Sequence, residues 1–371
     1  MIHKNPVNKL FLINILVLAV TGFFVFLSAS MGLLAKDDIK YTSIITNQIF
    51  FGFILGGIIF YINSKINYKF WKKYSFWLWI ASIFLTLLVF IPYTGLEFAG
   101  AKRWILIGPI SFQPSEILKI FYIIFLATWL SVVKNKIKTF RYGTLPFIII
   151  TFITVILLLF QPDNDTAFVI LLTGMSMYFV GGANLKHFAV VIGFSIILLV
   201  FVLLNRPYVL DRIQTFMEPT KANIQSTGYQ VHQSLIAIGS GGLGGRGFGK
   251  SLQKFDLLPE PVGDSIFAVL GEEFGFVGAF FIVLLFISFL FQSLKIGMNT
   301  NDLFGGLLMV GFGIMIVSQS FINMASMLGI FPLSGLPLLF ISHGGTALFF
   351  TFFSVGIMLN ISRINNQNQQ I

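Results

Sequence analysis

The chain has 371 residues, of which 56% are hydrophobic and 10% are charged, and its mean hydropathy is +0.88. A soluble domain usually carries about 25% charged residues, so this composition excludes a soluble globular protein and indicates one that crosses a membrane repeatedly. The absence of cysteine excludes disulfide bonds and cysteine-ligated metals. The formal net charge is +10, but the basic residues are spread over several short connections, so we expect no nucleic-acid partner.

Apolar segments recur along the whole chain. A helix needs about 20 mostly apolar residues to cross the hydrocarbon core of a bilayer. We predict an all-α polytopic membrane protein with about ten transmembrane helices in a single membrane domain, residues 1–371. The first segment is longer than the apolar part of a signal peptide, so we expect it to be retained. The ten candidate segments are 10–33, 43–63, 76–93, 117–133, 145–161, 166–182, 187–204, 265–294, 303–322 and 338–361.

Basic residues fall on alternate connections between these segments. Because short loops rich in Lys and Arg stay in the cytoplasm, both termini are predicted to be cytoplasmic. The polar segments 94–116, 161–166 and 205–264 then lie outside, the last as one long extracytoplasmic loop. The basic residues behind this orientation are Lys4, Lys9, Lys65, Lys69, Lys72, Lys73, Lys134, Lys136, Lys138, Arg141, Lys186, Lys295 and Arg363.

The first outer segment continues into the fourth span as GAKRWILIGPISFQPSEILK (100–119). Lys102 and Arg103 precede a tryptophan, which is typical of an anchor at headgroup level, and the same cations also suit a ligand contact. Glu116 and Lys119 lie three residues apart on one face of a helix that enters the membrane. Such a pair is either an internal brace or the wall of a functional cavity.

Two pairs of carboxylates lie close to predicted helix ends. Asp163 and Asp165, in the turn QPDNDT (161–166), favour helix capping, with a divalent-cation site as the alternative. Glu272 and Glu273 lie two turns inside the eighth span, where a lipid-facing carboxylate is too costly. We interpret both glutamates as structural.

The glycine-rich stretch GSGGLGGRGFGKS (239–251) formally matches two nucleotide-binding patterns. Both patterns require a strand before the loop and a helix after it, and this sequence predicts no such strand, so we do not expect an ATP site. The stretch is interpreted as a flexible loop close to the bilayer surface. An alternative is that Arg246, Lys250 and Lys254, with successive backbone amides, contact a lipid pyrophosphate.

Asp264 lies where the long polar loop returns to an apolar helix, in LPEPVGDSIFAVLGEE (258–273). An aspartate just before a helix is a good N-cap, yet a capping box would need Glu or Gln three residues later, and Phe267 is there. A carboxylate at a membrane boundary is also a candidate for catalysis. The residues alone leave both interpretations open.

Five stretches together resemble the SEDS family, the FtsW/RodA group of bacterial cell-wall proteins. They occur in the family's order and cover most of residues 95–363, and GKSLQKFDLLPE (249–260) resembles the FtsW branch more than the RodA branch. The five stretches are GAKRWILIGPISFQPSEILK, QPDNDTAFVILL, GYQVHQSLIAIGSGGLGGRGFGKS, LPEPVGDSIFAVLGEEFGFVG and LSGLPLLFISHGGTALFFTFFSVGIMLNISR.

The resemblance implies a peptidoglycan glycosyltransferase that polymerises lipid II during cell division, in the bacterial cytoplasmic membrane with its active face outside. The acidic residue that the family uses in the long loop falls on Asp264, which would act as general base. The departing undecaprenyl pyrophosphate needs positive charge, from Mg²⁺ or Mn²⁺ or from Lys and Arg. The substrate-binding candidates are Lys102, Arg103, Gln113, Ser115, Glu116, Lys119, Arg246, Lys250 and His343, and the metal candidates are Asp163 and Asp165.

The chain departs from the family pattern at four positions. Gly263 and Ser265 flank the catalytic aspartate where Thr and Phe are more usual. Asp165 replaces the glycine of the pattern QPD-x-Gly, and His343 replaces a common tyrosine. We therefore expect the geometry of these turns to differ from the family pattern.

The implied partners are lipid II, the undecaprenyl-linked glycan strand, a class B penicillin-binding protein and other membrane proteins of the division machinery. A separate transpeptidase is expected because the chain lacks a partnered transpeptidase motif set. A lipid II flippase is the main competing interpretation, since the intramembrane ionisable residues suit a polar path. A scaffold for division proteins is the third.

Overall fold

The computed structural model describes residues 8–35, 38–91, 95–98, 101–107, 110–217 and 227–368. Eight helical segments in this part of the chain are long and apolar enough to cross a membrane, and Asn164–Val180 and Leu185–Val200 are shorter apolar helices. Together they match the ten predicted spans, so the predicted fold class is confirmed. The eight segments are Lys9–Leu34, Tyr41–Lys65, Lys69–Phe90, Pro114–Val133, Phe140–Phe160, Ile266–Met298, Leu303–Met327 and Gly345–Ile364.

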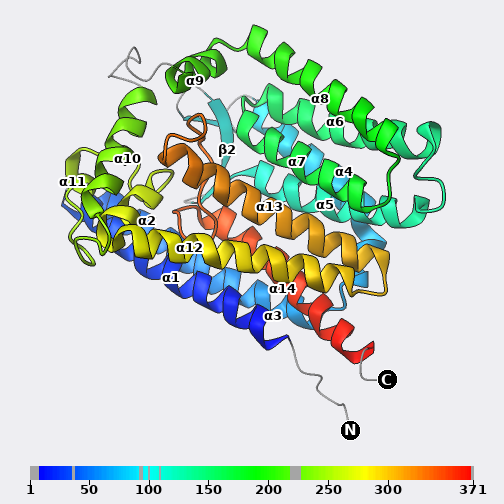
Figure 1. Cartoon of the computed structure of the whole chain (residues 1–371), viewed down its shortest axis with the longest axis horizontal. Helices are drawn as coiled ribbons and strands as arrows, with labels where there is room; N and C mark the ends of the chain where they lie inside the picture. Colours follow the sequence, from blue (N-terminus) through cyan, green and yellow to red (C-terminus); the bar gives the residue numbers. More distant parts are fainter. Residues whose placement is uncertain are drawn as a thin grey trace.

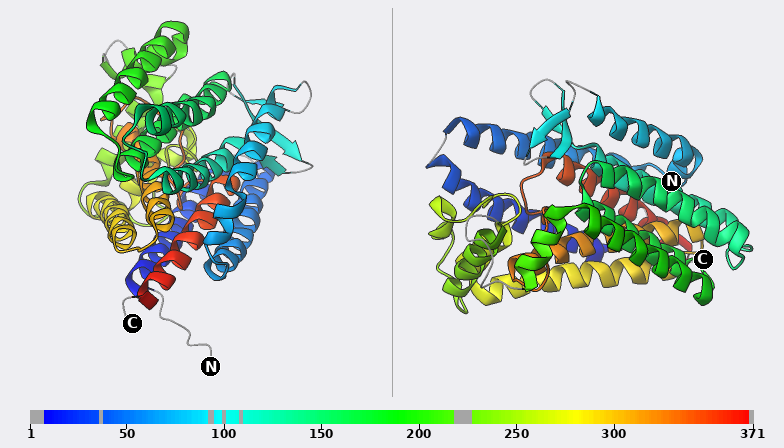
Figure 2. Two further views of the ribbon diagram at one scale, coloured as in Figure 1. Left: turned by 90° about the vertical axis from the view of Figure 1, so that its right-hand side faces the viewer. Right: turned by 90° about the horizontal axis from the view of Figure 1, so that it is seen from above.

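The helices form one bundle, in which the start of the first helix and the end of the last lie at the same end (Figure 1 and Figure 2). This arrangement agrees with the prediction that both termini lie on one side of the membrane. The helices are α1 (Lys9–Leu34), α2 (Asp38–Asn47), α3 (Gly56–Lys65), α4 (Lys69–Leu87), α5 (Pro114–Val133), α6 (Leu145–Phe160), α7 (Asn164–Val180), α8 (Leu185–Asn205), α9 (Pro207–Met217), α10 (Thr227–Gly241), α11 (Gln253–Asp256), α12 (Ile266–Met298), α13 (Leu303–Met327) and α14 (Gly345–Asn368), with short η1 (Gln48–Leu55), η2 (Leu88–Phe90) and η3 (Phe140–Thr144).

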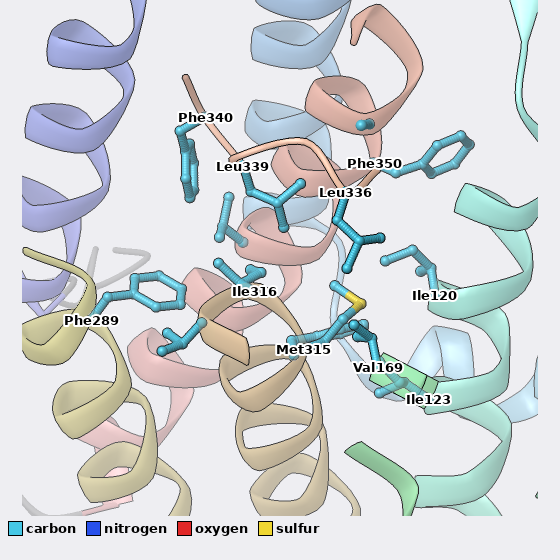
Figure 3. Close-up of a cluster of buried hydrophobic side chains, with 14 of the residues drawn as sticks. Ile120, Ile123, Val169, Phe289, Met315, Ile316, Leu336, Leu339, Phe340 and Phe350 are labelled. Atoms are coloured by element: carbon cyan, nitrogen blue, oxygen red, sulfur yellow. The ribbon is translucent and has the colours of Figure 1, made fainter. Parts of the chain in front are cut away.

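Helix α13 lies at the centre of the bundle and contacts α5, α7, α12 and α14. Leu336 and Leu339, from the connection between α13 and α14, point toward Met315 and Ile316 of α13 (Figure 3). Polar residues are also buried in α13, among them Gln319 and Asn323. Because lipid is as apolar as the core, the inward face of a membrane helix is marked by small and polar residues rather than by hydrophobicity.

The first outer segment contains a small antiparallel sheet that the sequence analysis did not predict. Its strands are β1 (Gly95–Phe98), β2 (Ala101–Ile107) and β3 (Ile110–Phe112), in the order β1-β2-β3. The register pairs Leu96 with Trp104 and Ile105 with Phe112. Arg103 therefore lies on a strand, which holds its side chain in a defined direction beside the start of α5.

The interpretation of the glycine-rich stretch as a flexible loop is wrong. Helix α12 is interrupted at Gly275, whose φ is 64° and ψ is −163°, and this break leaves backbone N–H groups without helical acceptors. The carbonyls of Gly242 and Leu243 accept from Phe276 (2.9 Å) and Val277 (3.1 Å). The described part of the 205–264 loop is also largely helical, with α9, α10 and α11.

Gly245 is a point of close backbone approach in this docking, and we expect Gly245→Ala to destabilise the protein. Its φ is +77°, and a Cβ there would collide with the carbonyl of Glu273. A left-handed backbone and a clash with fixed backbone together cost about 2–3 kcal/mol. Thermal unfolding in detergent micelles would show the loss.

The matched control is Gly244→Ala, because a Cβ at Gly244 meets nothing within 4 Å. The control should unfold at the wild-type temperature. Equal effects at the two glycines would contradict the docking described above.

Candidate active site

Asp264 ends a tight turn that precedes α12. The carbonyl of Glu260, which has φ +44°, accepts from the amides of Gly263 (3.0 Å) and Ser265 (3.2 Å). Ser265 is the N-cap residue of α12, and no side chain caps that helix. The helix-cap interpretation of Asp264 is therefore wrong, and its half-buried carboxylate is available for another role.

The connection between α13 and α14 holds this turn in place. Ser342 Oγ donates to the Gly263 carbonyl (2.8 Å) and accepts from the Leu338 amide (2.8 Å). The Asn323 amide group donates to the carbonyls of Asp264 (2.8 Å) and Leu336 (2.8 Å). The backbone on both sides of Asp264 is thus tied to buried groups of α13 and of the connection that follows it.

A second carboxylate lies across Gly335 from Asp264. A methyl group at Gly335 would be 3.7 Å from Asp264 Oδ2 and 3.8 Å from Asp165 Oδ2. Asp165 Oδ2 accepts from the Gly335 amide (3.0 Å) and forms an ion pair with Arg212 Nη1 of α9 (3.0 Å). The site therefore combines residues from α7, α9, the turn before α12 and the α13–α14 connection.

These surroundings raise the pKa of Asp264 to about 7. Burial is the largest cause, and the negative charges of Glu260 and Asp165 add to it, while Arg212 and Arg103 act in the opposite direction. A group whose pKa lies near the working pH is best suited to take up and release a proton in catalysis. Perturbed carboxylates of this kind gather at functional sites.

His343 lies beside the same turn, and its amide donates to the Val262 carbonyl (2.7 Å). Burial lowers the pKa of His343 to about 4, so the imidazole is neutral at neutral pH. The ring stacks on Phe26 with centroids 6.2 Å apart. Among the described residues its buried Nε2 has no hydrogen-bond partner, which leaves it able to bind a polar group.

The buried pair Glu116–Lys119 links α5 through Gln319 to the α13–α14 connection, which holds the turn before α12. Lys119 Nζ donates to Glu116 Oε1 (2.9 Å) and to Gln319 Oε1 (2.7 Å), and Gln319 Nε2 donates to the Pro337 carbonyl (3.3 Å). The pair is therefore an internal brace that reaches the α13–α14 connection. Gln113 is half-buried as the N-cap of α5, and the hydroxyl of Ser115 is buried without a partner in the described structure.

The basic candidates separate into two groups. Arg103 donates to the Pro162 carbonyl and contributes to the field at Asp264, whereas the side chain of Lys102 lies outside the described residues. Arg246 of the glycine-rich stretch pairs with Glu272 of α12 (3.5 Å), and Lys250 of the same stretch is exposed. The structure thus places Arg103, rather than Arg246 or Lys250, with Asp264.

The glutamates of α12 hold the glycine-rich stretch, a contact that the sequence did not predict, and an ion pair with Glu273 occupies Lys254. Glu272 accepts from Ser251 Oγ (2.5 Å) and from the Leu252 amide (3.0 Å). Glu273 forms a fully buried ion pair with Lys254 (2.7 Å) and accepts from Ser28 Oγ (2.5 Å). Both carboxylates are therefore structural.

The two metal candidates do not form a protein-held cation site. Asp163 caps α7 by accepting from the Thr166 amide (3.4 Å), and the Oδ2 atom of Asp165 is taken by Arg212 and Gly335. Within the described ranges, no three His, Asp or Glu side chains lie close enough together to hold a metal ion. An ion bound only by protein groups does not fit this arrangement.

Sequence reasoning missed three residues of the site: Arg212, Asn323 and Gly335. Asn323 carried a usable signal, since a buried amide in an apolar helix must satisfy its hydrogen bonds internally. Arg212 and Gly335 carried none, because their roles depend on contacts across the fold.

The fold and this site define a polytopic membrane protein with a carboxylate-centred site at the bundle end opposite the termini. A family model described as "Cell cycle protein", covering FtsW, RodA and SpoVE, matches residues 8–367. The chain belongs to this family.

Known relatives are similar in sequence to this chain along most of its length. The chain is 36% identical to stage V sporulation protein E of Bacillus subtilis over 97% of each protein, and 35% identical to a probable peptidoglycan glycosyltransferase FtsW of Geobacter sulfurreducens over 83% of each. The solved structure of RodA from Thermus thermophilus superposes with a TM-score of 0.69 at 25% identity, covering 96% of this chain and 97% of that one. A chain of a peptidoglycan synthase complex superposes with a TM-score of 0.76 at 24% identity, covering 94% and 97%, and shows the shared fold.

Proposed function

We propose that this chain is a peptidoglycan glycosyltransferase that polymerises lipid II, with Asp264 as its general base. The observation that carries the proposal is the half-buried Asp264 carboxyl in its tied turn, whose pKa is raised to about 7 by burial and by the charges of Glu260 and Asp165. The relatives named as peptidoglycan glycosyltransferases support the reaction class.

The reaction joins two sugars while a lipid pyrophosphate departs. Asp264 takes the proton from the 4-hydroxyl of the GlcNAc of lipid II as that oxygen attacks the anomeric carbon of the growing strand. The new C–O bond forms, the bond from the anomeric carbon to the phosphate oxygen breaks, and undecaprenyl pyrophosphate leaves with the electron pair. Asp264 then returns its proton to water, and one carboxylate suffices because the donor is already activated.

Positive charge is needed at the departing pyrophosphate. Arg103 is the best-placed candidate, since it lies close enough to lower the pKa of Asp264, and Lys102 is its neighbour on β2. A Mg²⁺ or Mn²⁺ ion bound to the pyrophosphate of the substrate would supply further positive charge to the leaving group. Polymerisation that EDTA leaves unchanged would contradict that role for the ion.

We assign the protein to the bacterial cytoplasmic membrane, with Asp264 on the extracytoplasmic face. The support is the basic character of the connections on the side of the termini. A class B penicillin-binding protein is the proposed partner, and other division proteins are expected around it. The structural relative from a peptidoglycan synthase complex supports this pairing.

A proteoliposome assay tests the proposal against the flippase alternative. Purified wild-type protein would receive labelled lipid II in one leaflet only. The polymerase produces glycan chains and releases undecaprenyl pyrophosphate. Label that crosses into a protected leaflet without any polymer would reject the proposal in favour of transport.

The activity should rise with pH through about 7. Asp264 acts as a base only when deprotonated, and its pKa is about 7, so activity is lost as the pH falls below that value and reaches a plateau above it. An ordinary aspartate, with a pKa near 4, would leave the rate flat from pH 6 to pH 8. The initial rate of polymerisation, measured from pH 5.5 to 8.5 with saturating lipid II, distinguishes these outcomes.

A further inference from the structure

An ion pair between two distant parts of the chain lies directly beside Asp264. Asp165 at the start of α7 and Arg212 of α9 are 47 residues apart in sequence, and their side chains are only 21% and 14% exposed. A fully exposed pair has little effect because water screens it. Partial burial lets these two charges act more strongly on a neighbouring carboxylate.

The pair also fixes backbone at the site. Asp165 Oδ2 accepts from the Gly335 amide as well as from Arg212, and Gly335 lies between the Asp165 and Asp264 carboxylates. Arg206, between α8 and α9, donates to the Leu159 carbonyl (3.0 Å) at the end of α6. That bond is to a neutral acceptor, whereas Arg212 of α9 pairs with a carboxylate.

Among the described residues, four charged groups act on Asp264. Glu260 in its own turn and Asp165 on α7 raise its pKa, whereas Arg212 on α9 and Arg103 on β2 lower it, and burial is the largest contribution. Asp165 and Arg212 therefore oppose each other at Asp264 while they are paired with each other. Removing either charge leaves the effect of its partner on Asp264 without that opposing contribution, so the two removals should shift the pKa of Asp264 in opposite directions.

We propose that Asp165 is a positioning residue for catalysis, which holds the Arg212 guanidinium and the Gly335 backbone in a charge-balanced arrangement against Asp264. This inference rests on the proposed function, because its effect is exerted on the general base. Asp165 stands at one of the positions where this chain departs from the family pattern.

Two substitutions test the direction in which the pH of half-maximal activity shifts. In Asp165→Asn the amide oxygen still accepts from Gly335 but carries no charge, so the pKa of Asp264 falls and the pH of half-maximal activity moves down. In Arg212→Gln one of the two cations that lower the pKa of Asp264 is lost while the Asp165 charge stays, so the midpoint moves up. Each shift should be on the order of one pH unit. One unit below the wild-type midpoint, Asp165→Asn should keep roughly fivefold more of its plateau rate than wild type keeps, for a shift of about one unit.

Two further variants serve as controls. Asp211→Asn makes the same chemical change at an exposed position next to Arg212, and its midpoint should equal that of wild type. Arg212→Lys keeps the charge and should restore the midpoint even where its plateau rate is reduced.

The outcomes separate this inference from the proposed function. A wild-type protein that does not polymerise lipid II rejects the proposed function. An active wild type whose Asp165→Asn and Arg212→Gln midpoints stay fixed, or move in the same direction, rejects only the role of Asp165. A reduced plateau with an unmoved midpoint shows that the ion pair is merely structural and also overturns the proposal.

Discussion

Asp264→Asn should reduce lipid II polymerisation by at least about 100-fold, because a positioned general base contributes about 10²–10⁴-fold to a reaction of this kind. The amide has nearly the shape of the carboxylate but cannot accept the proton of the attacking hydroxyl. The backbone carbonyl of residue 264 would still accept from Asn323, so the turn should keep its structure. Initial rates of glycan formation at pH 8, where Asp264 of the wild type is deprotonated, measure the loss.

Two controls make this result specific to catalysis. The Asp264→Asn protein should unfold at or above the wild-type temperature, because the amide removes a carboxylate whose charged form is disfavoured by burial, and this result would show that the site is intact. Asp211→Asn, at an exposed position of α9, should polymerise at the wild-type rate. An Asp264→Asn protein that forms polymer at the normal rate would remove Asp264 from the mechanism, and Asp264 mutants that keep full function in cells would favour a scaffold.

We expect Lys254→Met to lower the free energy of unfolding by about 3 kcal/mol. Lys254 and Glu273 are 0% and 1% exposed and lie 2.7 Å apart, and removing one partner leaves the other charge buried and unpaired. Ser28 would still donate to Glu273, which keeps the expected loss near the lower end of the range for buried pairs. Unfolding in mixed micelles by titration with denaturing detergent provides the measurement.

Lys250→Met is the matched control, since Lys250 belongs to the same glycine-rich stretch but is exposed. It should change the free energy of unfolding by less than about 0.5 kcal/mol. The double variant Lys254→Met with Glu273→Gln should lose less stability than the two single losses added together, because the second substitution removes the unpaired charge. A Lys254→Met protein as stable as wild type would show that the ion pair does not hold the stretch to α12.

The spans were predictable because their cause is local. A segment crosses the bilayer when enough consecutive residues are apolar, and the eight long helices with the two shorter ones follow the predicted segments. The capping role of Asp163 was also visible in sequence, since a helix start needs only a few neighbouring residues. The order inside the 205–264 loop was not visible, because the glycines that suggested flexibility serve instead to let two backbones approach at Gly245 and Gly275.

Composition, local hydrophobicity and a resemblance spread over most of the chain were enough to predict the class of this protein, its membrane spans and Asp264 as the catalytic candidate. The surroundings of that carboxylate were not predictable, because they depend on tertiary contacts. Asp165 meets Gly335 across 170 residues and Arg212 across 47, and contacts at such separations depend on how α7, α9 and α13 pack. The proton affinity of Asp264 is therefore a property of the folded chain, since burial and four distant or neighbouring charges set it together.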